Sequence, residues 1–237
     1  MQEKQNNTGP TSGFNMLTLI ARSLITGAIL AAVLFISSGK TNWIGGWMYI
    51  TVVVAGQIVA VMVAMPKSPE TIAARSVISS EAPAWDRAIA PIITLAPQII
   101  AVTAGLFVRF RGVPHTPIWI VAAGMILAVL GFTLGLQAAL SNKFFTPVYC
   151  IQKDRGHTVI EDGPYRIIRH PGYAGTILFL IAIPMILGAA WAYLPAVLTV
   201  LLLVLRTHLE DRALRSDLHG YSDYAVKVSS HLLPGVW

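Results

Sequence analysis

Long apolar runs separated by short polar segments dominate the chain. Three of these runs, 44–65, 88–108 and 116–142, hold no charged residue, and a fourth covers 16–38 with Arg22 near its start. A helix that crosses a membrane needs about 20 predominantly apolar residues. Each of the four runs therefore predicts one transmembrane helix.

A fifth apolar run, 171–205, is too long for one crossing. As a single helix it would rise about 52 Å, against a hydrocarbon core of about 30 Å. Pro184, Gly188 and Pro195 interrupt it. We predict a helical hairpin with legs 173–187 and 191–208 and a turn at 188–190, and a single kinked helix is the alternative. The predicted fold class is all-α: a polytopic helical membrane protein with four single spans plus a C-terminal helical hairpin.

The polar segments complete the predicted organisation. Residues 1–15 are rich in Gln, Asn, Thr and Gly and predict a disordered tail, and residues 16–237 predict a single membrane domain whose part 141–237 holds the polar chemistry. Ser68 followed by Pro69 and Glu70 predicts the start of an interfacial helix. Gly131 and Gly135 form a Gly-x-x-x-Gly pattern, which is typical of close helix packing and is also compatible with a homodimer seam.

Composition excludes several classes of protein. Hydrophobic residues make up 55% of the 237 residues and charged residues only 12%, whereas soluble domains hold about 25% charged residues. One cysteine, Cys150, excludes a disulfide scaffold. The net charge of +6 comes from residues spread between apolar runs, so it predicts no nucleic-acid partner.

The distribution of charge predicts an orientation. If the N-terminus is cytoplasmic, the outer loops hold only Lys40, Arg109 and Arg111 of the 17 Lys and Arg residues. Cytoplasmic loops carry the excess of Lys and Arg. We therefore predict an integral membrane protein with both termini in the cytoplasm, for example in a bacterial inner membrane, and with its polar chemistry on that face.

Candidate chemistry lies in the loop before the hairpin and at the end of its second leg. Pro171 predicts a helix start directly after His170, where free backbone N–H groups favour an anion. Arg206 and Glu210 are four residues apart and share one helix face. They lie at the cytoplasmic end of the second leg, at the same depth as His170. The alternatives are a simple interface anchor for the loop and a weak helix-stabilising pair for Arg206 and Glu210.

Several motifs together resemble one known superfamily. They are Gly163-Pro164-Tyr165, residues 169–175, residues 210–214, Gly220-Tyr221 with Tyr224, residues 233–237 and, more weakly, residues 68–70 with Arg75. This set is similar to the isoprenylcysteine carboxyl methyltransferase and phospholipid methyltransferase superfamily. The resemblance implies an integral membrane methyltransferase that binds S-adenosylmethionine in a pocket open to the cytoplasm.

The resemblance also implies roles for individual residues. Arg206 and Glu210 would be catalytic and face the methyl acceptor, and no metal is implied. Lys227 and His231 stand where the family's tail often carries arginines, which leaves the acceptor open. The residues that would contact the cofactor are Gln152, His157, Thr158, Val159, Ile160, Tyr165, Arg169, His170, Pro171, Tyr173 and Glu210.

Three functions remain after this comparison. The favoured one is O-methylation of a lipophilic acceptor, an isoprenylcysteine-like carboxylate, with a phospholipid amine or a small thiol as the alternative acceptor. An NADPH-dependent membrane reductase is a second class, because membrane sterol reductases carry a similar Arg-His-Pro-x-Tyr element. A non-catalytic membrane protein is the third.

Overall fold

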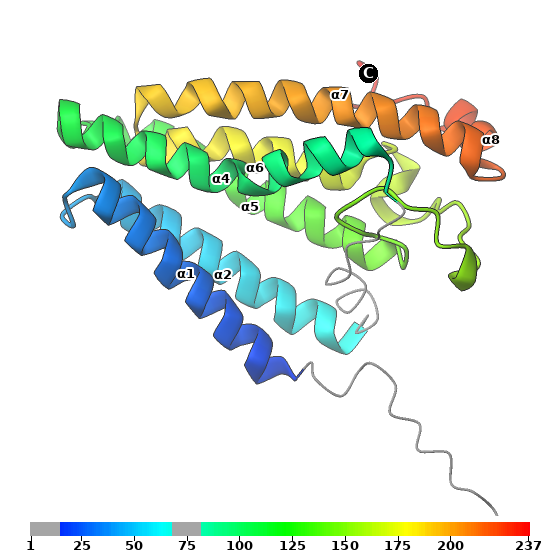
Figure 1. Cartoon of the computed structure of the whole chain (residues 1–237), viewed down its shortest axis with the longest axis horizontal. Helices are drawn as coiled ribbons and strands as arrows, with labels where there is room; N and C mark the ends of the chain where they lie inside the picture. The colour runs from blue at the N-terminus through cyan, green and yellow to red at the C-terminus, as the bar shows by residue number, and fades with distance from the viewer. Residues whose placement is uncertain (1–14, 68–81) are drawn as a thin grey trace, which may run out of the picture.

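The computed structural model describes residues 15–67 and 82–237. These residues form α-helices that pack against one another, with short 3-10 helices and loops between them (Figure 1). No β-strand occurs within these residues, so the predicted all-α class is confirmed. In chain order the elements are α1 (Met16–Ser38), α2 (Ile44–Lys67), α4 (Ala84–Arg111), α5 (Ile118–Ser141), η1 (Lys153–Arg155), η2 (Gly163–Arg166), α6 (Pro171–Leu187), η3 (Ala190–Ala192), α7 (Tyr193–Asp217) and α8 (Tyr221–Lys227).

Five helical stretches are long and apolar enough to cross a membrane. They are α1, α2, α4, α5 and the stretch Ala190–Asp217, which joins η3 to α7. The predicted runs match these helices to within a few residues, because backbone groups in lipid must be satisfied inside the helix itself. The protein is therefore a polytopic membrane protein. Helix α4 begins at Ala84 rather than at residue 88, which places Asp86 in its first turn, where a carboxylate complements the helix dipole.

Helices α6 and α7 form the predicted hairpin. Gly188, with φ of 67°, ends α6 in the left-handed conformation that favours glycine, and η3 leads into α7. The second leg runs to Asp217 rather than to residue 208. With 25 residues, α7 is about 37 Å long against about 25 Å for α6. Its last turns therefore extend beyond the start of α6.

Glycines bring α5 and α6 into close contact. A Cβ atom on Gly131 would lie 2.6 Å from the carbonyl oxygen of Gly175, and a Cβ on Gly175 would lie 2.6 Å from that of Gly131. Small residues allow this approach of two helix backbones in a membrane protein. The predicted close helix packing through Gly131 is thus present within the chain, and the homodimer stays a prediction.

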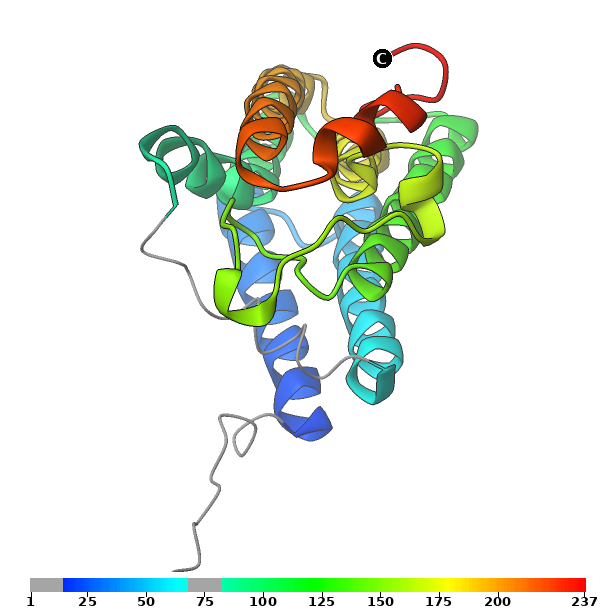
Figure 2. The same ribbon diagram turned by 90° about the vertical axis from the view of Figure 1, so that its right-hand side faces the viewer.

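The polar segments gather at one end of the helices. The loop 142–170, helix α8 and the C-terminal tail lie there, beside the start of α4 and the ends of α5 and α7 (Figures 1 and 2). The backbone N–H groups of Arg169 and His170 donate to the carbonyl oxygens of Ser230 and His231, at 3.0 Å each. These two bonds tie the tail to the loop.

Two predictions fall largely or wholly on residues that are not described. The predicted disordered tail lies outside the described residues except for Asn15, whose side chain accepts a hydrogen bond from the backbone N–H of Thr18 and caps α1. The predicted interfacial helix beginning at Ser68 also lies outside them.

Candidate functional site

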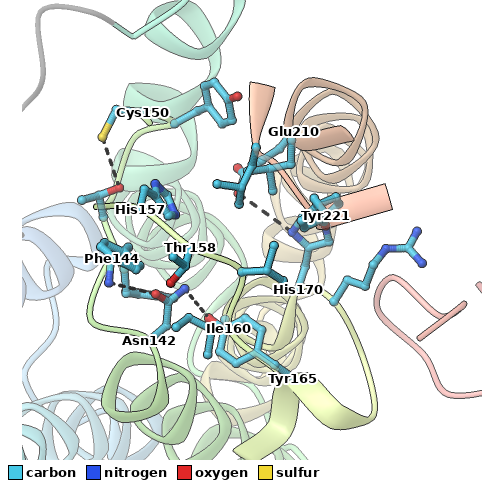
Figure 3. A pocket seen from close by; sticks show the side chains of 18 of the residues that line it. Asn142, Phe144, Cys150, His157, Thr158, Ile160, Tyr165, His170, Glu210 and Tyr221 are labelled. Atoms are coloured by element: carbon cyan, nitrogen blue, oxygen red, sulfur yellow. Dashed lines mark hydrogen bonds and ion pairs between the residues drawn. The ribbon is translucent and has the colours of Figure 1, made fainter. Parts of the chain in front are cut away.

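A cavity opens at the polar end, between the loop 142–170, the ends of α6 and α7, and α8 (Figure 3). About 810 Å³ of space is empty in the cavity and its open mouth together. Its lining comprises Asn142, Phe144, Phe145, Thr146, Val148, Tyr149, Cys150, His157, Thr158, Val159, Ile160, Tyr165, Arg169, His170, Gly172, Tyr173, Glu210, Leu214, Leu218, Tyr221 and Tyr224.

Most of the predicted site residues meet in this cavity. Of the predicted cofactor contacts, the lining includes all except two, Gln152 and Pro171, and it also excludes Arg206. These residues come from the loop, from the first turn of α6 and from α7. They are His157, Thr158, Val159, Ile160, Tyr165, Arg169, His170, Tyr173 and Glu210.

The loop reaches the cavity through a tight turn and a proline. Gly163, with φ of 58°, begins the short helix η2, a conformation that suits glycine. Pro171 occupies the first position of α6, as predicted, because its missing N–H would be unpaired there. His170 therefore sits at the point where the loop becomes helix, with Tyr173 in the first turn.

One wall of the cavity is polar. The Tyr173 hydroxyl donates to Oε2 of Glu210 at 2.5 Å, and Nδ1 of His170 lies 3.9 Å from Oε1. The rings of His170 and Tyr173 stack at 5.7 Å, within 3° of parallel. Figure 3 shows Glu210, His170 and Tyr221 on the same side of the cavity. This wall presents a carboxylate that is oriented by a phenol.

A buried charge cluster lies behind this wall. Asp211 is 4% exposed, and its Oδ1 accepts from Nε of Arg169 at 2.6 Å and from the hydroxyl of Tyr221 at 2.9 Å. Burial, and after it the Asp211 carboxylate, raise the pKa of Tyr221 far above its ordinary value, so this phenol remains a donor. Arg169 also donates to the carbonyl oxygens of Val228 and Ser229, at 2.6 and 2.8 Å. Its guanidinium is thus occupied by Asp211 and the tail.

Lys227 and His231, the two basic residues singled out in the C-terminal part of the sequence, have separate surroundings. His231 lies against the buried cluster, with Nε2 at 2.5 Å from Nη2 of Arg169 and 3.3 Å from Oδ2 of Asp211. Lys227 instead forms an exposed ion pair with Glu161 at 3.2 Å. His231 therefore packs against the buried charges behind the polar wall, whereas Lys227 lies on the protein surface.

Arg206 is buried beneath the polar wall. Its Nε donates to Oδ1 of Asp86 at 2.7 Å, and its Nη2 donates to the carbonyl oxygen of Pro147 at 2.8 Å. The guanidinium carbon lies 5.2 Å from the centroid of the Tyr173 ring, within cation–π distance. Arg206 thus supports Tyr173 and is paired with a carboxylate that is 120 residues away along the chain.

Sequence analysis missed Asp86. The carboxylate lies in a polar segment that precedes an apolar run, where acidic residues are common, and nothing nearby in the sequence shows its partner. The signal in the sequence was its position two residues before the apolar run 88–108, since ionisable residues at a membrane boundary are functional candidates.

The opposite wall is aromatic. The rings of Phe144 and His157 stack at 4.3 Å, and Figure 3 shows both across the cavity from Glu210. The backbone N–H of Gln152 donates to Nδ1 of His157 at 3.2 Å, which places the proton of the neutral ring on Nε2. Burial and, next, the charge of Arg155 lower the pKa of His157. At neutral pH this wall therefore carries an uncharged pair of rings.

Gln152 acts on the loop rather than on the cavity. Its Nε2 donates to the carbonyl oxygen of Phe144 at 2.8 Å, and its Oε1 accepts from Nη1 of Arg155 at 2.5 Å. Both bonds hold the turn that carries the stacked rings. The predicted cofactor contact of Gln152 stays a prediction.

Comparisons with known proteins single out the central part of the chain. Residues 121–216 match the model of the Isoprenylcysteine carboxyl methyltransferase (ICMT) family. Two rice proteins, from Oryza sativa subsp. indica and subsp. japonica, are each named "Probable protein-S-isoprenylcysteine O-methyltransferase" and are each 31% identical to the chain over 65 residues. That alignment covers 27% of this chain and 34%, about a third, of each relative. The predicted resemblance is therefore confirmed for the matched region, which contains most of the residues that line the cavity.

Proposed function

From the match of residues 121–216 to a family of carboxyl methyltransferases, we propose that this chain is a membrane methyltransferase that uses S-adenosylmethionine. The observation that carries the proposal is the cavity, most of whose lining belongs to the matched region and in which Glu210, Tyr173 and His170 face a pair of stacked rings. The favoured acceptor is the carboxylate of an isoprenylcysteine-like compound, the class named in the rice relatives.

The residues of the cavity fit S-adenosylmethionine chemically. The cofactor has a sulfonium and an ammonium group, both positive, and a flat adenine ring. Glu210 supplies a negative charge on the polar wall, and the Phe144–His157 pair supplies a flat aromatic surface. His170 lies just before the N-terminus of α6, a location that favours the cofactor's carboxylate. We therefore assign the polar wall to the amino-acid end and the aromatic wall to the base.

In this proposal the residues of the chain hold and orient the cofactor and the acceptor, and they need not activate the methyl group. When bound, S-adenosylmethionine supplies a methyl group that is already activated for in-line displacement. Glu210, oriented by Tyr173, would hold the cofactor's positive charge, and the apolar side chains of Leu214 and Leu218 in the lining would exclude water. A carboxylate acceptor is ionised at neutral pH and needs no general base.

We assign Arg206 to the acceptor side through Tyr173. The resemblance implies that Arg206 faces the acceptor. Its guanidinium lies against the ring of Tyr173, and the hydroxyl of that tyrosine donates to Glu210. The lipid part of the acceptor would lie against apolar side chains of the hairpin, and the cofactor would arrive from water. We also propose that the polar end is cytoplasmic, because the opposite loops hold only three of the 17 Lys and Arg residues.

The first test is a binding titration of the protein purified in detergent. S-adenosylmethionine and its demethylated product should bind, and NADPH should not. Tyr173→Phe removes the hydroxyl that orients Glu210 and should weaken binding about tenfold, since a hydrogen bond to a charged group is lost. Tyr193→Phe is the matched control, because Tyr193 begins α7 at the far end and is 42% exposed. Binding of NADPH alone would identify a reductase and refute the proposal.

The second test identifies the acceptor. Transfer of a labelled methyl group is measured to N-acetylcysteine with a farnesyl thioether, to phosphatidylethanolamine and to a small thiol. Labelling of the farnesylated compound, lost when its carboxylate is replaced by an amide, supports the favoured acceptor. Labelling of the lipid amine or of the thiol instead would keep the methyltransferase and reject the carboxylate. A protein that binds the cofactor and labels none of the three would contradict the proposed acceptors.

A further inference from the structure

Asp86 is a completely buried carboxylate with two strong partners. The residue has no solvent exposure, although it lies in the first turn of α4. Its Oδ1 accepts from Nε of Arg206 at 2.7 Å, and its Oδ2 accepts from the backbone N–H of Tyr149 at 2.7 Å. A buried charge is tolerated only when it is paired and hydrogen-bonded. Asp86 and Arg206 therefore neutralise each other.

This pairing decides which carboxylate holds Arg206. Arg206 and Glu210 are four residues apart on α7, a spacing at which arginine and glutamate readily pair. Arg206 instead forms its ion pair with Asp86, and Glu210 accepts from the hydroxyl of Tyr173. Pro147 and the ring of Tyr173 complete the surroundings of the guanidinium. Asp86 thus removes Arg206 as a competitor for the carboxylate that lines the cavity.

We propose that Asp86 is a positioning residue that acts through Arg206 and keeps Glu210 free to hold the positively charged end of S-adenosylmethionine. The inference rests on the proposed function, because it assigns Glu210 to that cofactor. Without the charge of Asp86, the buried guanidinium has no counterion and turns to Glu210. The cavity then loses the negative charge that attracts the sulfonium and ammonium groups.

The decisive comparison is between a single and a double variant. Asp86→Asn keeps the size of the side chain and removes its charge, so the Kd for S-adenosylmethionine rises about tenfold or more. Asp86→Asn combined with Arg206→Gln removes the competing cation as well, and the Kd returns to within about threefold of wild type. Such a rescue would also follow if the unpaired guanidinium merely damaged the fold, so Asp86→Asn is repeated on Glu210→Gln. If Asp86 acts through Glu210, it raises the Kd no further there, whereas a merely structural role adds to the loss. All values come from calorimetric titration in detergent.

Controls separate this inference from general damage and from the proposed function. Asp162→Asn is the matched control: Asp162 pairs with Arg166 on the surface, where both side chains are more than 70% exposed, so the Kd stays unchanged. If Asp86→Asn does not fold, Asp86→Glu decides, because it keeps the negative charge and the Kd then stays within about threefold of wild type. A large loss of affinity in that charge-preserving variant would overturn the inference.

The remaining outcomes are also assigned. Equal affinities of wild type and Asp86→Asn refute the inference and leave the methyltransferase proposal intact. A double variant that binds no better than Asp86→Asn refutes it as well. A wild-type protein that binds no S-adenosylmethionine refutes both the proposed function and the inference.

Discussion

Replacing Asp211 by asparagine tests the support of the polar wall. The change keeps the size of the side chain and removes its negative charge. Asp211 accepts from Nε and Nη2 of Arg169, at 2.6 and 3.2 Å, from Tyr221 at 2.9 Å and from Arg215 at 3.0 Å. We expect Asp211→Asn to release the C-terminal tail from the loop that carries His170.

The magnitude follows from the burial of Arg169. This arginine is 3% exposed, and breaking a buried ion pair by removing one partner costs about 3–5 kcal/mol. Because Arg169 also donates to the carbonyl oxygens of Val228 and Ser229, the penalty falls on the joint between loop and tail. A loss of that size raises the open population of the joint about 150- to 5,000-fold.

Hydrogen exchange measured by mass spectrometry is the appropriate assay. The amides of Arg169 and His170 donate to the tail, so their exchange should accelerate by about the factor given above, while α1 and α2 stay protected. Asp223→Asn, an exposed change in α8, is the control and should leave exchange unchanged. Wild-type protection of the Arg169 and His170 amides in Asp211→Asn would refute the assigned role of the buried cluster.

Two further predictions concern packing and pH. Gly175→Ala should lower the free energy of unfolding in detergent by about 1–3 kcal/mol, because its Cβ would meet the carbonyl oxygen of Gly131 at 2.6 Å. Gly135→Ala places its Cβ in open space within α5, so it should not destabilise the protein, and equal melting temperatures of the two variants would contradict the packing. Burial, and then Arg155, lower the pKa of His157 in the folded protein, so the unfolded chain binds the proton more readily. The contribution of His157 to the free energy of unfolding should therefore be fully present above its unfolded pKa of about 6.5 and should be lost as the pH drops towards its lower pKa in the folded protein. The fall should be shallower in His157→Asn, and identical pH profiles of the two proteins would contradict this.

The spans could be predicted from the sequence because each is a long run without charge. In lipid such a run has one solution, a helix, so the prediction needs no knowledge of the neighbours. The turn at Gly188 was equally accessible, since a run too long for one crossing must be broken where glycine and proline allow it. Helix α7 was predicted too short because its last turns are polar and are stabilised by partners elsewhere in the chain.

The partners of the charged residues could not be predicted in the same way. The spacing of Arg206 and Glu210 suggests a mutual pair, yet Arg206 pairs with Asp86 and Glu210 accepts from Tyr173. Pair formation depends on how α4, α6 and α7 pack, which local periodicity does not encode. Most of the cofactor contacts that the resemblance to a known family implies do line the cavity, but the resemblance did not include Asp86.

The Asp86–Arg206 pair also has a consequence for biosynthesis. Chains are synthesised from the N-terminus, so α4 is made and offered to the membrane well before α7 exists. During that interval Asp86 lacks its partner Arg206, and a carboxylate alone in hydrocarbon is costly. Because Asp86 lies in the first turn of α4, its carboxylate can stay hydrated at the membrane boundary until α7 is made. The cavity is therefore assembled late, when α7 arrives and carries Arg206 to a carboxylate already in position.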